Sequence, residues 1–348
     1  MTTINQSVAW KSPSNIAIVK YWGKTGLQLP LNPSISFSLE NCYTNTRVDY
    51  RLKQKPTDES FSFLFEGNSH PPFEPKLKHF FQYVFERYPL LRQYAFDISS
   101  ENSFPHSAGI ASSASAMCAL AFCLIQIHNR IRGDECWPNA DEAGSLARLG
   151  SGSACRSTHG GWMMWGTCPY MAYSNDNYAI SINDHVHPMF QHLCDTILVI
   201  SSKRKPVSSS LGHQMMTAHP YAKARIDQAL DNTSQVLDAL KEGDFDRFAK
   251  VCEEEALSLH ALMMSSRPGY MLMHPNTMTA IDIIRQYRQQ TGIPVCFTLD
   301  AGPNIHLIYP DNHQLQIRDW IANELRPLCE NQFMIDDRLG GGPVPIVI

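Results

Sequence analysis

The sequence predicts a globular protein that mixes strands and helices, in one large domain or two ordinary ones. Its 348 residues are 43% hydrophobic and 18% charged, with no low-complexity tract, so the chain has ample material for a core. The opening region contains segments that alternate apolar and polar residues, as strands do, and these predict a β-meander. Long segments with apolar residues at helical spacing follow, mostly in the second half of the chain.

The first half of the chain carries most of the expected strands. The β-branched run at residues 15–22 is a strand or the segment that leaves one. Further strands are expected at residues 29–39, 47–52, 61–65 and 94–99. Helices are expected over residues 75–86, 116–127 and 139–148.

A change of composition divides the chain near its middle. The stretch at residues 181–191 is polar and rich in histidine, and it is the best domain boundary. The run DTILVIS that follows, from Asp195, predicts the first strand of a new unit. Later elements are helices over residues 222–240, 246–264 and 277–289, then strands at residues 295–299 and 306–309.

The composition excludes several classes of function. The net charge is −4 and the isoelectric point about 6.4, so no general basic surface is offered to nucleic acid. None of the ten cysteines forms a C-x-x-C pair, and the fourteen histidines show no H-x-x-x-H pattern, so we expect no transition-metal site built by the protein. The N-terminus lacks a signal-peptide pattern, and the longest apolar run, residues 116–127, is too short to span a bilayer. We therefore expect a soluble, cytoplasmic protein with reduced thiols.

The most distinctive stretch is a run of small residues that leads into a helix. Residues 104–115 are mostly small, and residues 116–127 predict a buried helix. Such a loop makes an anion site, because the first helical turn has unpaired N–H groups and the positive end of the helix dipole. Ser112, Ser113 and Ser115 add hydroxyl donors. The alternative is an ordinary serine-capped core helix.

Two lysines flank a glycine turn in the segment KYWGK. Lys20 and Lys24 enclose Tyr21, Trp22 and Gly23. This arrangement suits an anionic ligand that is held against a rigid aromatic wall. The alternative is a solvated loop whose lysine stems lie along the surface.

Two later segments combine cations with serine hydroxyls. In GSGSACRSTHGG, Arg156 stands among serines, and a guanidinium in such a place forms a fork for carboxylate or phosphate. The alternative is a structural arginine that binds backbone carbonyls. In KRKPVSSS, residues 203–210, three cations precede three hydroxyls, and the alternative is a basic solvated turn followed by serine N-caps.

The segment DAGPN follows a predicted strand and offers a carboxylate at a rigid position. In the functional interpretation, Asp300 is a base aimed from the strand end. In the alternative, the segment is a plain hairpin turn, since Asp, Gly, Pro and Asn all form turns. The glycine-rich residues 338–343 form either a tail turn or a loop beside the substrate.

Together these segments indicate phosphoryl transfer. They offer a site for ATP phosphates, a site for an acidic substrate and a base, so catalysis would rest on positioning and electrostatics. Neither a G-x-x-x-x-G-K-[ST] loop nor a protein-kinase H-R-D set is present.

Six motifs, in order along nearly the whole chain, resemble those of the GHMP kinase superfamily and, within it, of the mevalonate diphosphate decarboxylases. They are SPSNIAIVKYWGK (12–24), LPLNPSISFSL (29–39), ENSFPHSAGIASSASA (101–116), ARLGSGSACRSTHGGW (147–162), KPVSSSLGHQM (205–215) and FTLDAGPN (297–304). Any one of them could arise by chance. Six in family order, including KYWGK, GSGSACRS and DAGPN, are very specific.

The resemblance implies a two-domain α+β fold with the active site in the cleft between the domains. Residues 1–190 would form the N-terminal domain with the ATP-phosphate loop, and residues 191–348 the C-terminal domain with the catalytic aspartate. The implied reaction phosphorylates the 3-hydroxyl of mevalonate 5-diphosphate with ATP, then loses phosphate and CO2 to give isopentenyl diphosphate. ATP and Mg²⁺ are implied, with Mg²⁺ held mainly through the ATP phosphates. A homodimer is implied, with neither nucleic acid nor membrane as partner.

The resemblance also implies roles for individual residues. In the catalytic set, Asp300 is the base, Lys20 pairs with it, and Ser113 bridges the γ-phosphate and the substrate. Arg156 and Asn15 hold the substrate carboxylate. The remaining ATP-binding residues are Ser107, Ala108, Gly109 and Ser112. The diphosphate end of the substrate meets Tyr21, Trp22, Gly23, Lys24, Lys76, Ser151, Gly152, Ser153, Ala154, Cys155 and Ser210.

The sequence departs from the family pattern at several positions, most of them at the diphosphate end. Thr25 and Gly26 replace a common Arg-Asp pair, and Lys76 replaces an arginine, which keeps the charge but loses the fork. Ser210 replaces threonine, and His106 replaces a smaller residue. The alternatives are therefore a decarboxylase or 3-kinase that acts on mevalonate 5-phosphate or mevalonate, or a catalytically inactive ligand-binding relative. The inactive alternative is opposed by the presence of Asp300, Lys20, Arg156 and Ser113.

Overall fold

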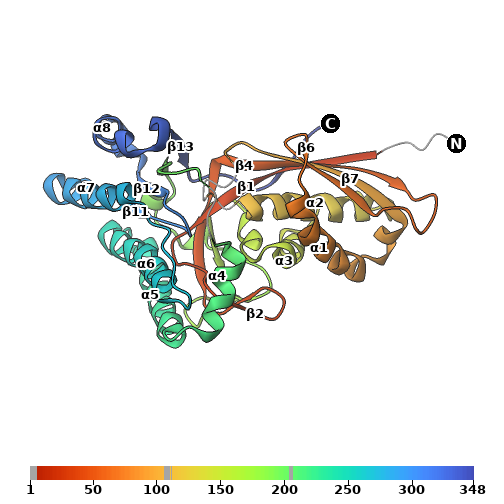
Figure 1. Cartoon of the computed structure of the whole chain (residues 1–348), viewed down its shortest axis with the longest axis horizontal. Helices are drawn as coiled ribbons and strands as arrows, with labels where there is room; N and C mark the ends of the chain where they lie inside the picture. Colours follow the sequence, from red (N-terminus) through yellow and green to blue (C-terminus); the bar gives the residue numbers. More distant parts are fainter. Residues whose placement is uncertain (1–5, 106–109, 111, 204–206) are drawn as a thin grey trace.

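The computed structural model describes residues 6–105, 110, 112–203 and 207–348. Its strands form two main sheets, each with helices packed against it, and the two parts lie end to end in an elongated molecule (Figure 1). This mixture of helices and strands confirms the α+β class. The division between residues 190 and 191 stays a prediction.

The larger sheet belongs to the first part of the molecule. Its strand order is β14-β1-β4-β7-β5-β6, and β8 pairs with the beginning of β4 and with β9. The strands are β1 (Gln6–Ala17), β4 (Ser34–Leu52), β5 (Phe61–Phe65), β6 (Asn68–Ser69), β7 (Tyr94–Asn102), β8 (Trp162–Trp165), β9 (Ile180–Ser181) and β14 (Val344–Pro345). A separate two-stranded ribbon, β2 (Lys24–Thr25) and β3 (Leu29–Pro30), follows the KYWG segment.

The predicted β-meander is wrong, because β7 lies between β4 and β5. Helix α1 (Glu74–Arg87) lies in the connection from β5 to β7. Because the chain crosses over through this helix, β7 runs parallel to β5. The strands expected at residues 29–39 and 47–52 are largely one strand, β4. The exposed pair Glu40 and Asn41 interrupts the alternation there, and the Asp337 carboxylate accepts both of their backbone N–H groups, at 2.9 and 2.8 Å.

Helices α1, α2 (Ser112–Ile131) and α3 (Ala140–Gly150) pack beneath this sheet (Figure 1). Asn139 caps α3 by accepting the N–H groups of Asp141 and Glu142. In the described part of the chain, α2 alone is long and apolar enough to cross a membrane, but 72% of its most apolar window is buried inside the fold. It is therefore the central core helix of this part.

The second sheet has the order β11-β12-β10-β13. Its strands are β10 (Leu193–Leu198), β11 (Cys296–Thr298), β12 (Ile305–Pro310) and β13 (Met334–Arg338). The helices of this part are α4 (Ser209–Met215), α5 (Ala222–Glu242), α6 (Phe245–Ser265), α7 (Pro275–Thr291) and α8 (Gln314–Trp320). Gly243, at φ 77°, ends α5, and the Asp244 side chain caps α6 by accepting the Arg247 N–H.

The glycine-rich tail ties the end of the chain back to the first sheet. Gly340 exchanges hydrogen bonds with Ser38 of β4, and β14 pairs with β1 at its edge. These contacts make residues 338–343 a strap across the two sheets. The segment is not among the residues that line the cleft described below.

Candidate active site

A polar cleft of about 750 Å³ lies where loops from both parts of the molecule meet, within the usual size range of ligand sites. It brings together most of the residues that the sequence singled out. The predicted residues that line it are Lys20, Tyr21, Trp22, Lys24, Lys76, Ser112, Ser113, Ser151, Gly152, Ser153, Arg156, Ser210 and Asp300.

Some predicted residues lie behind the wall of the cleft. Asn15, Gly23, Ala154 and Cys155 are not among the lining residues. The predicted ATP-binding residues 107–109 and the His106 substitution lie outside the described part of the chain.

Lys20 and Asp300 form an ion pair across the cleft. Lys20 follows the end of β1, and Asp300 lies in the connection between β11 and β12. Lys20 Nζ lies 3.0 Å from Asp300 Oδ1 and donates a second bond, of 2.5 Å, to the Ala17 carbonyl. The Lys20 side chain is 2% exposed, whereas that of Asp300 is 27% exposed and so remains accessible to a ligand.

The surroundings of Asp300 keep its carboxylate charged. Burial alone raises the pKa of Asp300, but the nearby charges of Lys20, His306 and Arg156 outweigh burial, and the net pKa is lowered. The group is therefore an anion at neutral pH and can accept a hydrogen bond or a proton from a hydroxyl group.

Arg156 is a buried cation whose neighbours hold it from behind. Its Nε donates to Asn15 Oδ1 at 3.2 Å, and its Nη1 donates to Ser34 Oγ. The Asn15 amide nitrogen in turn donates to Ser157 Oγ at 2.8 Å. Asn15 thus orients Arg156, and the remaining face of the guanidinium is turned to the cleft. The described residues place no carboxylate in hydrogen-bonding contact with it.

The first turn of α2 lines the same cleft. The helix begins at Ser112, so Ser112 and Ser113 stand where backbone N–H groups are unpaired and the helix dipole is positive. Ser113 Oγ lies 3.1 Å from Ser151 Oγ, at the end of α3. The short helix Gly152–Ser157 follows Ser151 and carries Arg156, which joins the two serine-rich segments in one wall.

The KYWG segment is held by a histidine that the sequence analysis missed. Gly23 has φ 97°, and its N–H donates to Nδ1 of His213 at 3.0 Å. The His213 ring lies 4.3 Å from the Tyr21 ring and 4.7 Å from the Trp22 ring. Burial lowers the pKa of His213 to about 3, helped by the charges of Lys24 and Arg156, so the imidazole is neutral. No local pattern marks this contact, because α4 follows Gly23 by almost two hundred residues.

The Tyr21 hydroxyl is buried beside the cleft and has no hydrogen-bond partner in the described part of the chain. A buried hydroxyl without a partner is costly, which points to a ligand atom as its missing acceptor. Gly152 leaves room for it, since a Cβ there would approach the Tyr21 hydroxyl to 2.7 Å.

Two further lysines face the cleft. Burial lowers the pKa of Lys76 to about 8, with a further contribution from the charge of Lys24. Burial also lowers the pKa of Lys24, whose Nζ donates to Gln28 Oε1 at 2.9 Å. Among the described residues that line the cleft, Lys20, Arg156 and these two lysines are four cationic side chains, and Asp300 is the single carboxylate. The excess of positive charge indicates an anionic ligand.

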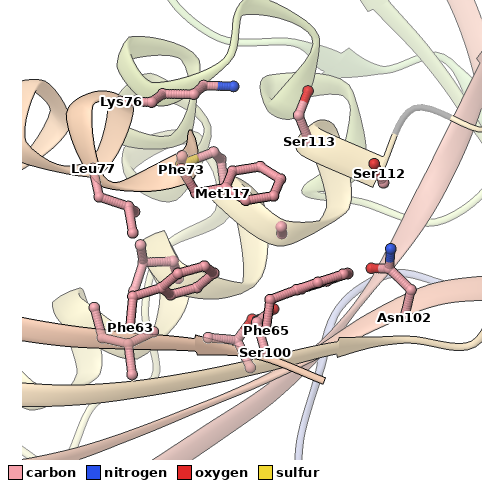
Figure 2. A pocket seen from close by; sticks show the side chains of 14 residues that line it. Phe63, Phe65, Phe73, Lys76, Leu77, Ser100, Asn102, Ser112, Ser113 and Met117 are labelled. Carbon is pink, nitrogen blue, oxygen red and sulfur yellow. The ribbon is translucent and has the colours of Figure 1, made fainter. Parts of the chain in front are cut away.

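A second, apolar pocket adjoins the cleft (Figure 2). It is lined by Phe63, Phe65 and Phe73, and the side chains of Ser100 and Asn102 bring polar atoms to its wall. The two cavities share Lys76, Ser112 and Ser113 as lining residues. No sequence pattern indicates this pocket, since its phenylalanines come from β5 and the turn before α1, where aromatic residues predict only a core.

The described residues contain no group of three or more His, Cys, Asp and Glu side chains that could hold a metal ion. The cleft does offer the serine hydroxyls of α2 and the Asp300 carboxylate. Mg²⁺ keeps several waters and is commonly held through substrate phosphates, so this donor set fits a metal that arrives with a nucleotide.

Two family models together match most of the chain. The diphosphomevalonate decarboxylase-like N-terminal domain matches residues 12–179, and the mevalonate 5-diphosphate decarboxylase C-terminal domain matches residues 196–338. Among curated proteins, diphosphomevalonate decarboxylase of Saccharomyces cerevisiae is 32% identical over 89% of this chain and 78% of its own length. The chain belongs to the diphosphomevalonate decarboxylase family. The rat diphosphomevalonate decarboxylase is 28% identical, over 85% of this chain and 75% of the rat protein.

Solved structures of this family share the whole fold. Mevalonate diphosphate decarboxylase from Staphylococcus aureus gives a TM-score of 0.84 at 28% identity, over 99% of both chains. A structure of MDDEF in complex with MVAPP, AMPPCP and magnesium gives a TM-score of 0.82 at 26% identity, over 98% of this chain and 99% of the other. These likenesses confirm the resemblance drawn from the six motifs.

Proposed function

We propose that the protein catalyses the ATP-dependent decarboxylation of mevalonate 5-diphosphate to isopentenyl diphosphate, with ADP, phosphate and CO2 as the other products. The observation that carries the proposal is the Lys20–Asp300 pair, which stands in a cationic cleft at the first turn of α2 in a chain of this family. The relatives named above are decarboxylases of the same substrate, and one was solved with MVAPP, AMPPCP and magnesium.

The first step is phosphoryl transfer to the tertiary 3-hydroxyl. Asp300 orients this hydroxyl and accepts its proton as the oxygen attacks the γ-phosphate, and the bond between that phosphate and ADP breaks. Lys20 stabilises both the carboxylate and the negative charge of the transferring phosphoryl group.

The second step removes phosphate and CO2. A tertiary alcohol is a poor leaving group, whereas its phosphate ester leaves with the electron pair of the C–O bond. The electrons of the bond to the carboxylate then form the alkene, and CO2 departs. Arg156 binds the carboxylate and fixes its direction, with Asn15 as its support from behind.

The ATP phosphates meet Ser112 and Ser113 at the first turn of α2. The base points toward the adjoining phenylalanine-lined pocket, whose cavity of about 30 Å³ would have to widen to receive it. Mg²⁺ is held mainly by the ATP phosphates, where it neutralises charge on the transferring group. The contribution of residues 107–109 to this site stays part of the proposal.

The diphosphate tail of the substrate lies toward the KYWG segment. Lys24 and Lys76 supply charge, and the hydroxyls of Tyr21, Ser153 and Ser210 supply hydrogen bonds. We also propose a cytoplasmic location and a homodimer.

The number of phosphates on the substrate decides between this proposal and its nearest alternatives. We expect the highest kcat/KM with mevalonate 5-diphosphate, because Lys24 and Lys76 both face the tail. The purified enzyme should be assayed with ATP and, separately, mevalonate, its 5-phosphate and its 5-diphosphate, with ADP and CO2 both measured. A preference for mevalonate 5-phosphate would show that the proposed substrate is wrong. Formation of ADP without CO2 would indicate a kinase.

A further inference from the structure

Both polar backbone groups of Lys20 are bound by side chains from the helices of the second part. The Lys20 N–H donates to Glu255 Oε2 of α6 at 2.7 Å. Its carbonyl accepts Nη2 of Arg225, from α5, at 3.0 Å, and also the Asn32 amide at 3.0 Å. Helices α5 and α6 therefore fix the peptide that carries the Lys20 side chain.

Glu255 and Arg225 form a fully buried fork. Arg225 Nη1 and Nη2 each lie 2.6 Å from a different oxygen of Glu255, and the Asn232 amide donates to Glu255 Oε1 at 2.6 Å. The side chain of Glu255 is 0% exposed and that of Arg225 is 1% exposed. A buried ion pair contributes little net stability once its desolvation is counted. The presence of this ion pair is better explained by its contacts with the Lys20 backbone, which position Lys20.

The same helix also binds the backbone of Asp300. His260 of α6 donates from Nε2 to the Asp300 carbonyl at 3.1 Å. Helix α6 thus holds the main chain of both members of a pair whose side chains meet at 3.0 Å. A helix is a rigid element, so the separation of its two contacts fixes the separation of the pair.

We propose that Glu255, through its fork with Arg225, and His260 are positioning residues that set the geometry of the Lys20–Asp300 pair. The inference rests on the proposed roles of Lys20 and Asp300. Neither Glu255 nor His260 lines the cleft, and both act through the residues that they hold.

Glu253 supplies a matched control on the same helix. It is also buried, and its oxygens pair with Arg285 at 3.1 Å and Arg288 at 2.5 Å, both on α7. Neither of these contacts involves Lys20 or Asp300. Glu253→Gln therefore removes a buried carboxylate of α6 from its two arginine partners, which are 45% and 25% exposed, without touching the catalytic pair.

Glu255→Gln in the full-length enzyme keeps the side-chain shape and removes the charge that binds Arg225. With ATP and mevalonate 5-diphosphate, kcat is expected to fall by about ten- to a hundredfold, the scale of a misplaced catalytic group. KM for ATP should change by less than about threefold. The labelling rate of the Lys20 amine by an amine-reactive reagent, followed by peptide mass spectrometry, should rise severalfold because the amine leaves its buried pair.

Glu253→Gln should change neither kcat nor the labelling of Lys20. Equal losses of kcat in the two variants, or unchanged Lys20 labelling in Glu255→Gln, would overturn the inference. The labelling needs no turnover, so it still decides the inference if the wild-type enzyme fails to use mevalonate 5-diphosphate, a result that would refute only the proposed function.

A second pair of variants serves if Glu255→Gln does not fold. His260→Gln keeps an N–H donor near the Asp300 carbonyl, whereas His260→Leu removes it at similar size. We expect kcat close to wild type in His260→Gln and a loss of about tenfold in His260→Leu. Equal kcat in these two variants would also contradict the inference.

Discussion

Asp300→Asn is expected to lower kcat by about a hundredfold or more, the scale of a lost general base. The amide has nearly the same shape and still accepts the bond from Lys20 Nζ, but it cannot take a proton. KM for both substrates should change much less, since the lost interaction belongs to the transition state. Release of phosphate and CO2 should fall together, because decarboxylation waits for phosphorylation. Steady-state assays of both products test this result.

The Asp300 variant also leaves Lys20 without its counter-charge. A cost of about 1–3 kcal/mol in the free energy of unfolding is therefore expected. The double variant Lys20→Met with Asp300→Asn removes the unpaired charge and should regain part of that stability, as judged by Tm, without regaining activity. Turnover within a few-fold of wild type in Asp300→Asn would remove Asp300 from the chemistry. Failure of the single variant to fold would instead support a turn-forming role.

Arg156→Lys is expected to lower kcat/KM for mevalonate 5-diphosphate by at least tenfold, or roughly 1.4 kcal/mol. Lysine keeps the positive charge but loses the planar fork that meets a carboxylate with two parallel bonds. In Arg156, two different nitrogens contact Asn15 and Ser34, whereas lysine has only one nitrogen for both supports and the substrate. KM for ATP should change little, because the proposed partner of Arg156 is the carboxylate of the other substrate.

Arg148→Lys is the matched control for this change. Arg148 is 5% exposed, against 4% for Arg156, and its guanidinium donates to the backbone carbonyls of Asn177 and Leu27. It does not line the cleft. This variant should lose stability and keep kcat/KM. If both variants lose activity in proportion to their loss of Tm, Arg156 has only a structural role.

Local patterns in the sequence were enough to locate most elements of the fold. Helical spacing places α5, α6 and α7 within a few residues of their observed bounds, because each buries one continuous face. The order of strands in the sheet could not be obtained in this way. The position of β7 between β4 and β5 depends on the crossover through α1, which alternation along a single strand does not reveal.

The start of α2 shows a second limit of local patterns. The helix was expected from residue 116, but it begins at Ser112. Serine has weaker helix propensity than alanine because its hydroxyl competes for backbone hydrogen bonds, so the serine-rich pattern predicts a loop. Packing of the helix into the core extends it through this segment. The consequence for the site is direct, since Ser112 and Ser113 stand in the first helical turn.

Some residues of the candidate site and its supports could be predicted from the sequence, and others could not. Residues in distinctive motifs, such as Lys20, Arg156 and Asp300, could be predicted and do meet in the cleft. His213 and Glu255 could not, because their partners are distant in sequence. One signal was nevertheless available for Glu255, which continues the apolar stripe of α6 between Val251 and Leu259. A charge at such a position indicates a buried partner.

In the proposed mechanism, ATP phosphorylates the 3-hydroxyl of mevalonate 5-diphosphate before CO2 is lost. The most direct test follows the oxygen of that hydroxyl, by labelling it with ¹⁸O and analysing the released phosphate by mass spectrometry. We expect one labelled oxygen in each phosphate released, with ADP and CO2 formed in equal amounts. Unlabelled phosphate would contradict this mechanism, because the phosphate would then have come from attack of water on ATP.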